Sequence, residues 1–223
     1  MVEHPSIPVR KIIACRFRHN ITFHTLNAST INDSFFSDLL IFADGTAVPS
    51  PLKTDIGMFW NDDDIMVFFR GQYKNLRFAP NLSPGLLQHK THHLWELADV
   101  FEVFIGPEAI DQGQYKEFQV APDSRWIDID VFHAIGTSNH HWFSGCRMRS
   151  FIDTDAKVWS AALFLPWNCF NTRYDSGLEW YVNFYRASGK YHGDELLAWS
   201  PVGTGPRCFH RPEKFGTIHF IER

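Results

Sequence analysis

Short apolar segments separated by turn-forming residues run along most of the chain. Clusters of Gly, Pro, Asn and Asp divide these segments at irregular intervals, which is typical of many strands joined by turns. The pattern predicts roughly ten strands and one or two short helical turns. The clearest expected strands are 57–60, 65–70, 100–105, 115–121, 126–132, 145–151, 157–165, 180–186 and 215–221. The helical pieces are 91–98, where Thr91 can cap a turn, and 166–170, where Pro166 suits the first helical position.

Two of these segments make specific structural predictions. The segments 57-GMFW-60 and 65-IMVFFR-70 are joined by 61-NDDD-64, whose Asn and Asp residues tolerate turn conformations, so a hairpin with both faces buried is expected. The segment 126-WIDIDVF-132 alternates between apolar and acidic residues. Alternation of this kind predicts a strand with its aliphatic residues in the core and with Asp128 and Asp130 in water.

The arrangement of elements favours an all-β fold. No long amphipathic helix is visible, which disfavours a parallel sheet with crossover helices. An antiparallel β-sandwich of the jelly-roll kind is the fold class expected for such a string of strands. The sequence shows no internal repeat and no linker, and 223 residues can bury a large core. Residues 1–223 are therefore expected to form a single domain.

Composition and charge exclude several classes of protein. The four cysteines lie far apart, without the spacing of a zinc ribbon or a disulfide framework, so they are expected to be free and mostly buried. A formal net charge of −4 is unsuited to a protein that neutralises phosphates, so nucleic acid is an unexpected partner. The N-terminal segment does not resemble a secretory signal, and no apolar stretch is long enough to cross a membrane. A cytoplasmic location without a membrane partner is the default expectation.

Several motifs, taken in order, carry a family resemblance. They are 54-TDIGMFWNDDDIMVFF-69, 94-LWELADVFEVFIGP-107, 115-YKEFQVAP-122, 165-LPW-167, 181-YVNFYR-186, 198-AWSPV-202 and 212-PEKFGTIHF-220. Together they resemble the carbohydrate-binding module family 9-like domain, a β-sandwich that binds sugar chains in polysaccharide-degrading proteins. The resemblance is clearest over 40–222. Before that range, either the opening strand has diverged or residues 1–15 are an extension.

This resemblance implies a sugar-binding site. In the family, a sugar is held between two tryptophan faces beside polar side chains, and the matching residues here are Trp95, Trp199 and the carboxylate Glu102. A rigid aromatic face suits the C–H groups of a pyranose ring. The segment 95-WELADVFE-102 has one residue more between tryptophan and glutamate than the family pattern. The added residue either changes which strand face Glu102 occupies or is absorbed in the loop before Asp99.

Further residues are candidates for supporting roles. Arg125 and Arg186 can donate to sugar hydroxyls or pair with carboxylates. The family's frequent structural calcium makes Asp62, Asp63 and Asp64 candidate ligands, although such a run is also typical of a tight turn. The resemblance thus implies non-catalytic binding of glucan- or xylan-type oligosaccharides or chain ends in carbohydrate catabolism. A separately encoded glycoside hydrolase, such as a xylanase, is the partner enzyme it suggests.

Four other functions are alternatives. Asp128 and Asp130 share a strand face at about the carboxylate spacing of inverting glycosidases, but no apolar pocket to raise a pKa is evident beside them. The histidines at 89, 92, 93, 140 and 141 suggest zinc, without an H-E-x-x-H frame. Haem binding, as in DOMON-type sandwiches, could use Met58, Met66 or Met148 with a histidine. Finally, the domain can be a structural or protein-interaction module without a sugar site.

Overall fold

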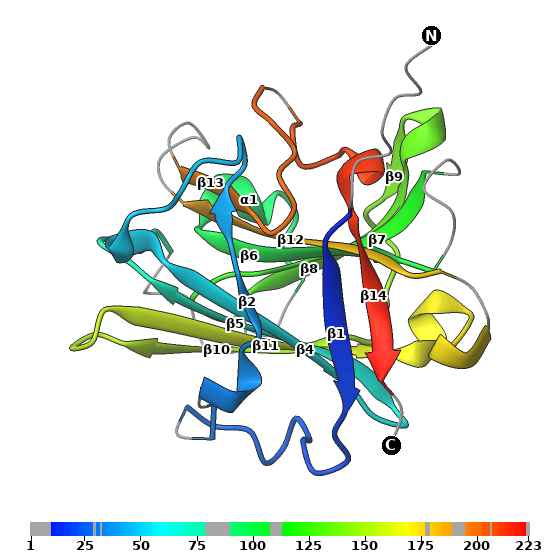
Figure 1. The fold of residues 1–223 in the computed structure, drawn as a ribbon, viewed down its shortest axis with the longest axis horizontal. Helices are drawn as coiled ribbons and strands as arrows, with labels where there is room; N and C mark the ends of the chain where they lie inside the picture. The colour runs from blue at the N-terminus through cyan, green and yellow to red at the C-terminus, as the bar shows by residue number, and fades with distance from the viewer. Residues whose placement is uncertain are drawn as a thin grey trace, which may run out of the picture.

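A single curled β-sheet forms most of the protein (Figure 1). The computed structural model describes residues 10–28, 30–31, 33–78, 90–107, 113–176, 179–188, 195–205 and 207–221. The strands are β1 (Ile12–Phe17), β2 (Asp38–Leu39), β3 (Ile41–Phe42), β4 (Thr54–Trp60), β5 (Asp64–Gln72), β6 (Val100–Gly106), β7 (Gln114–Val120), β8 (Trp126–Phe132), β9 (Thr137–Asn139), β10 (Arg147–Asp153), β11 (Val158–Pro166), β12 (Tyr181–Ser188), β13 (Glu195–Ala198) and β14 (Gly216–Ile221). The helical segments are α1 (Leu94–Leu97) and the 3₁₀ turns η1 (Asp33–Phe35), η2 (Ser50–Leu52), η4 (His133–Ile135), η5 (Trp167–Phe170), η6 (Tyr174–Ser176) and η8 (Pro212–Lys214).

The strands pair in the order β10-β11-β5-β4-β1-β14-β12-β6-β7-β8-β9. Most neighbours are antiparallel, but β1 pairs in parallel with both β14 and β4. The prediction of a β-rich fold is confirmed, whereas the antiparallel sandwich is not: one continuous sheet of mixed orientation curls on itself. The parallel pairs could not be read from local patterns, because long stretches of chain separate the strands that form them.

The predicted hairpin is confirmed in detail. Strands β4 and β5 pair antiparallel, with Trp60 opposite Ile65, and most of their residues are buried. The side-chain oxygen of Asn61 accepts hydrogen bonds from the backbone N–H groups of Asp63 and Asp64, at 2.9 and 2.8 Å. These bonds satisfy the backbone of the turn locally, as the Asn and Asp residues predicted.

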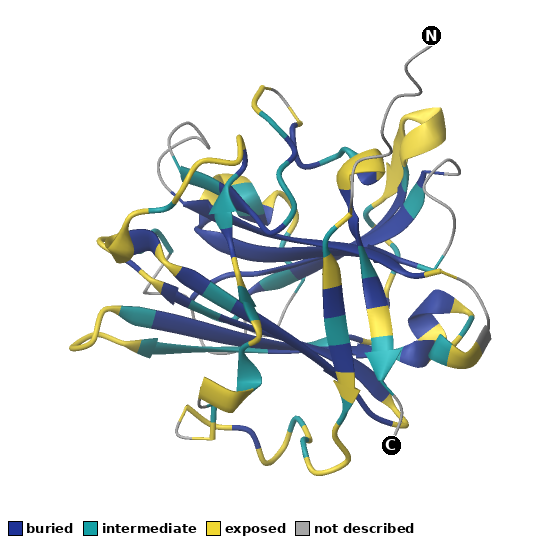
Figure 2. Ribbon diagram, viewed as in Figure 1, coloured by how far each residue is buried: buried dark blue, intermediate teal, exposed yellow. Residues whose placement is uncertain are grey.

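The main core lies where the sheet faces itself. Phe101 of β6 stacks on Trp159 of β11 with ring centroids 3.7 Å apart, and on Phe69 of β5 at 4.8 Å. These contacts join the β10-β11-β5-β4 part of the sheet to the β12-β6-β7-β8 part. Figure 2 shows the buried residues concentrated along the strands of both parts, with exposed residues gathered in the connections. The other face of β6, β7 and β8 packs in part against a second hydrophobic cluster and in part lines a cavity.

Strand β8 does not divide into the expected core and solvent faces: its aliphatic residues are buried as predicted, but its two aspartates are buried as well. Asp128 and Asp130 are both buried on the core side, where Lys90 and Lys116 donate to their carboxylates at 2.5 and 2.6 Å. The apolar and acidic residues of β8 do alternate between the two faces of the strand. Carboxylates that pair with lysines can nevertheless be buried on the face turned to the main core. The aliphatic residues of β8 face the opposite way.

The first and the last strand, β1 and β14, are neighbours in the middle of the sheet. β1 lies between β14 and β4, so residues 12–15 belong to the sheet rather than to an extension, while residues 1–9 lie outside the described part. All four cysteines are buried and free, as predicted. In the part of the chain that the structure describes, no helix has the length and apolar character needed to cross a membrane. The expected helical turns form as α1 and η5, although α1 starts after His93 rather than at Thr91.

Candidate functional site

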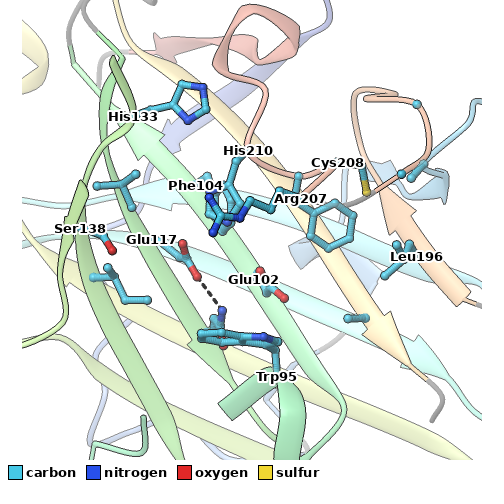
Figure 3. A pocket seen from close by; sticks show the side chains of 18 of the residues that line it. Trp95, Glu102, Phe104, Glu117, His133, Ser138, Leu196, Arg207, Cys208 and His210 are labelled. Atoms are coloured by element: carbon cyan, nitrogen blue, oxygen red, sulfur yellow. Dashed lines mark hydrogen bonds between the residues drawn. The ribbon is translucent and has the colours of Figure 1, made fainter. Parts of the chain in front are cut away.

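A cavity of about 1190 Å³ lies on the face of β6, β7 and β8 that is turned away from the main core (Figure 3). Direct pairing places Glu102 opposite Gln119, and Phe104 opposite Glu117, so these four side chains share one face. This floor is bordered by Trp95 of α1, by residues 42–46, by η4 and β9, and by the connection that carries residues 203–205 and 207–210. The cavity therefore combines aromatic walls with buried polar groups, which is the usual composition of a small-molecule site.

Short-range contacts fix Trp95 at the edge of this cavity. Its neighbour Leu94 is fully buried, which anchors the single turn of α1 to the sheet. Arg77 donates from Nη2 to the backbone oxygens of Trp95 and Ala98, at 3.1 and 3.3 Å, and so satisfies carbonyl groups at the end of this short helix. The Trp95 side chain is itself only partly buried and lines the cavity. A fixed backbone and an accessible ring are what a stacking surface requires.

Glu102 lies in the same cavity as Trp95. Helix α1 ends at Leu97 and β6 begins at Val100, so two residues connect them. Glu102 lines the cavity from β6, although it is only 4% exposed. Burial, and then the neighbouring charge of Glu117, raise the pKa of Glu102 well above its ordinary value.

Sequence analysis missed two polar residues on the neighbouring strand. Glu117 and Gln119 are buried on β7, and Gln119 Nε2 donates to Glu117 Oε1 at 2.6 Å. Burial raises the pKa of Glu117 to about 7, and the hydrogen bond from Gln119 partly opposes that shift. A signal was present, since 115-YKEFQVA-121 places polar residues inside a strand, but the pairing register that brings them beside Glu102 is not visible in the sequence.

The connection after β13 supplies a further wall. His210 and Tyr115 form a hydrogen bond of 2.7 Å between Nδ1 and the phenol oxygen. Burial is the main cause that lowers the pKa of His210 to about 4, so the imidazole is neutral at pH 7. Arg207 is exposed at the rim of the cavity, in a left-handed backbone conformation with φ of 55°. This wall thus presents a neutral imidazole and an exposed guanidinium to the cavity.

Trp199 does not join Trp95, which corrects the prediction of two facing tryptophan walls. Its side chain is fully buried in the main core, where Phe184 packs edge-on at 5.6 Å and the indole N–H donates to Asp38 at 2.5 Å. Gly216 lies so close that an added Cβ would stand 2.2 Å from the Trp199 ring. The residue follows a strand end as expected, but the sheet closes over it.

The two candidate arginines are also structural. Arg186 is buried on the core side, and its Nη1 donates to Gln72 O at 2.7 Å and to Thr54 Oγ1 at 2.9 Å. Arg125 pairs with Asp123 at 2.9 Å in the tight connection before β8. Neither residue lines the cavity. Their guanidinium groups satisfy buried acceptors of the fold, so the prediction that they donate to a sugar is wrong for this arrangement.

The metal and haem hypotheses find no support in the geometry. Asp64 pairs with Arg147 at 2.6 Å, while Asp62 and Asp63 are exposed in the turn. Among the described residues, no three His, Cys, Asp or Glu side chains are grouped so as to hold a metal ion. The calcium prediction therefore does not fit the donor set. The methionines suggested for haem lie buried in hydrophobic clusters at positions 58, 66 and 148.

Four of the five histidines in the zinc hypothesis do gather at one place. His92 lies 5.8 Å from His141 and 6.3 Å from His140, and His93 lies 6.4 Å from His140, measured between ring centroids. His89 lies outside the described residues. His93 and His140 form part of the cavity rim. The cluster thus belongs to the surroundings of the cavity.

The raised pKa of Glu117 predicts a pH-dependent stability. Between its ordinary value of 4.5 and about 7, folded Glu117 keeps a proton that the unfolded chain has released. The free energy of unfolding contributed by this residue therefore falls as the pH rises through that window. His210 acts oppositely: its contribution rises between about pH 4 and 6.5, because only the unfolded chain is protonated there.

Glu117→Gln removes the pH-dependent contribution of Glu117 to the free energy of unfolding, since glutamine does not titrate. Relative to the wild type, the variant is expected to gain stability as the pH rises from 4.5 to 7, measured by urea unfolding at several pH values. Asp155→Asn, which neutralises an exposed carboxylate in the β10–β11 turn, is the matched control. If the free energy of unfolding changed with pH in the same way in the wild type and in Glu117→Gln, the raised pKa of Glu117 would be contradicted.

The comparison with family models gives a partial match. Residues 133–220 match the model of carbohydrate-binding family 9. The matched range includes β9 to β13 and most of β14, and it carries the 165-LPW-167, 181-YVNFYR-186 and 212-PEKFGTIHF-220 motifs. The family 9 resemblance seen in the sequence is therefore confirmed. Carbohydrate-binding family 9 consists of non-catalytic binding modules, in agreement with the prediction that the chain is not an enzyme. No curated protein matches the sequence.

Solved structures share the fold along the whole chain. A protein of Bacteroides uniformis ATCC 8492, described as a candidate carbohydrate-binding protein, is 16% identical with a TM-score of 0.71, and the match covers 95% of this chain and 100% of the other. A family 9 carbohydrate-binding module of Caldicellulosiruptor kristjanssonii in complex with glucose is 11% identical, with a TM-score of 0.62 and coverages of 96% and 97%. A family 9 module of the same organism in complex with cellotriose is also 11% identical, with a TM-score of 0.64. The match covers 96% of this chain and 95% of the other.

Proposed function

We propose that the protein binds saccharides, without catalysing a reaction, in the cavity bordered by Trp95 and floored by Glu102, Glu117 and Gln119. The observation that carries the proposal is the meeting of Trp95 and Glu102 in one cavity. The sequence resemblance points to the same two residues. A flat ring beside carboxylate and amide groups suits a pyranose, which presents C–H groups on its faces and hydroxyls on its rim.

The size and the polarity of the cavity support this proposal. Its volume of about 1190 Å³ is larger than most small-molecule sites, so it has room for more than one sugar unit. Gln119 Oε1 is buried and has no hydrogen-bond donor among the described residues. A buried acceptor without a donor is costly, and a hydroxyl group of a ligand would satisfy it.

Glucan-type oligosaccharides are the first candidates. Solved structures with the same fold contain glucose and cellotriose, and the cavity beside Trp95 can take a chain of that kind. The same proposal has finer parts. The site can also take xylan-type chains or recognise chain ends, and the protein acts in carbohydrate catabolism together with a separately encoded glycoside hydrolase. A single accessible tryptophan wall replaces the two facing walls expected from the sequence.

Isothermal titration calorimetry with cello-, xylo- and manno-oligosaccharides and their reduced-end derivatives tests the proposal. We expect saturable binding of at least one series, with loss of affinity in the reduced derivatives if the site holds chain ends. Absence of binding to every member of the panel would contradict the proposal and favour the alternative, a structural or protein-interaction module. Exposed Phe143 and Ile135, at 70% and 73% exposure, are the residues that favour that alternative.

A further inference from the structure

Of the four buried carboxylates elsewhere in the described part of the fold, three have cationic partners in ion pairs. Three such pairs, with N–O distances of 2.5–2.6 Å, join Asp64 to Arg147, Asp128 to Lys90 and Asp130 to Lys116. A fourth buried carboxylate, that of Asp99, accepts a hydrogen bond from the backbone N–H of Arg77. Pairing of this kind offsets the cost of removing a charge from water.

The floor of the cavity departs from this pattern. Glu102 and Glu117 are 4% and 3% exposed, yet no described Lys or Arg lies within ion-pair distance of either carboxylate. Glu117 accepts one hydrogen bond, from Gln119, and Glu102 accepts none from the described residues. Figure 3 shows both carboxyl groups projecting from neighbouring strands toward the space that Trp95 borders. Two buried acids thus face the cavity without a counter-charge.

The electrostatics of Glu102 and Glu117 indicate that the site lacks a cation. Burial raises the pKa of both groups, and the charge of Glu117 raises that of Glu102 further. Protonation is one way to neutralise such a pair, and a cation placed between the carboxylates is the other. An ammonium group has three donors and no acceptor, which matches the free oxygens of Glu102, Glu117 and Gln119.

We propose that the cavity binds a saccharide carrying a free amino group, with its ammonium between Glu102 and Glu117 and its ring against Trp95. This inference rests on the proposed function, because it assigns a ligand class to the same site. Acidic or sulfated sugars would bring a like charge to the two carboxylates, and an acetylated amine would carry no charge. The remaining titratable groups that line the cavity are Asp44, His93, His133, His140, Arg207, Cys208 and His210.

Calorimetric titration at pH 6 with glucosamine, glucose and N-acetylglucosamine tests the inference, each in buffers of different ionisation enthalpy. Glucosamine is expected to bind about tenfold or more tightly than glucose, which is the effect of one charge-assisted hydrogen bond. Its ammonium displaces protons from the two carboxyl groups to the buffer, so the observed heat varies with the buffer. The two uncharged sugars displace none. Oligomers of glucosamine are expected to follow the monomer with higher affinity.

Glu102→Gln and Glu117→Gln keep the shape of the floor, and each removes one carboxyl group that can ionise beside an ammonium. Each variant is expected to lose the preference for glucosamine and its proton release, while Asp155→Asn, at an exposed turn away from the cavity, keeps both. Equal binding of glucosamine and glucose by the wild type would overturn the inference and leave the proposed function standing. A preference for glucosamine that persists in both glutamine variants would overturn it as well. Absence of binding to any saccharide would overturn both proposals.

Discussion

Trp95→Ala is expected to weaken saccharide binding roughly 30-fold or more, the loss that follows when an aromatic anchor worth about 2 kcal/mol is removed. The ring is partly exposed and lines the cavity, and its backbone is held by Leu94 and Arg77 independently of the side chain. The folded structure should therefore survive the change. Calorimetric titration with the tightest-binding oligosaccharide measures the loss, and the thermal midpoint checks the fold.

Trp142→Phe is the matched control for that variant. Trp142 is partly buried beside Lys116 and does not line the cavity, so its replacement should leave the affinity within a factor of about two, as for other surface changes. Trp95→Phe retains a smaller stacking face and should fall between the wild type and the alanine variant. Unchanged saccharide affinity in Trp95→Ala would contradict the proposal that Trp95 is the aromatic wall of the binding site.

Trp199→Ala should instead lower the free energy of unfolding by about 3–5 kcal/mol, the usual loss for truncating a buried tryptophan. Its ring fills a space closed by Phe184 and Gly216, and its indole N–H is the donor to Asp38. For a protein of this size the melting temperature should fall by roughly 6–20 °C. Because Trp199 does not line the cavity, affinity measured on the folded variant should stay the same.

Trp199→Phe provides the milder variant if the alanine protein does not fold. It keeps most of the packing and loses the hydrogen bond to Asp38, so an intermediate loss of stability with normal affinity is expected. A loss of affinity in a variant that remains folded would restore Trp199 as part of the sugar site. Together, the Trp95 and Trp199 variants separate the binding role of one tryptophan from the structural role of the other.

Local sequence patterns predicted strands well because turn chemistry is a short-range property. The turn at Asn61 is specified by hydrogen bonds within four residues, and the hairpin of β4 and β5 follows from it. The parallel pairing of β1 with β4 and β14 depends on contacts between residues far apart in the chain. No local periodicity encodes such contacts, and the continuous curled sheet was therefore missed.

The candidate site was predictable only in part, for a similar reason. The resemblance located Trp95 and Glu102, but their partners Glu117 and Gln119 depend on the register between β6 and β7. The burial of Trp199 and Arg186 depends on how the sheet curls over them. On β8, the acidic residues are buried because Lys90, 38 residues from Asp128, and Lys116, which is opposite Asp130 on β7, reach their carboxylates. Long-range pairing thus decides which polar residues face a ligand and which support the fold.

A crystal structure of the protein with the tightest-binding oligosaccharide tests the central claim most directly. The account predicts a sugar ring stacked on Trp95, with a polar group of the sugar within hydrogen-bond distance of the Glu102 carboxylate. A sugar bound elsewhere on the surface, with the cavity beside Trp95 unoccupied at a saturating concentration, would contradict it.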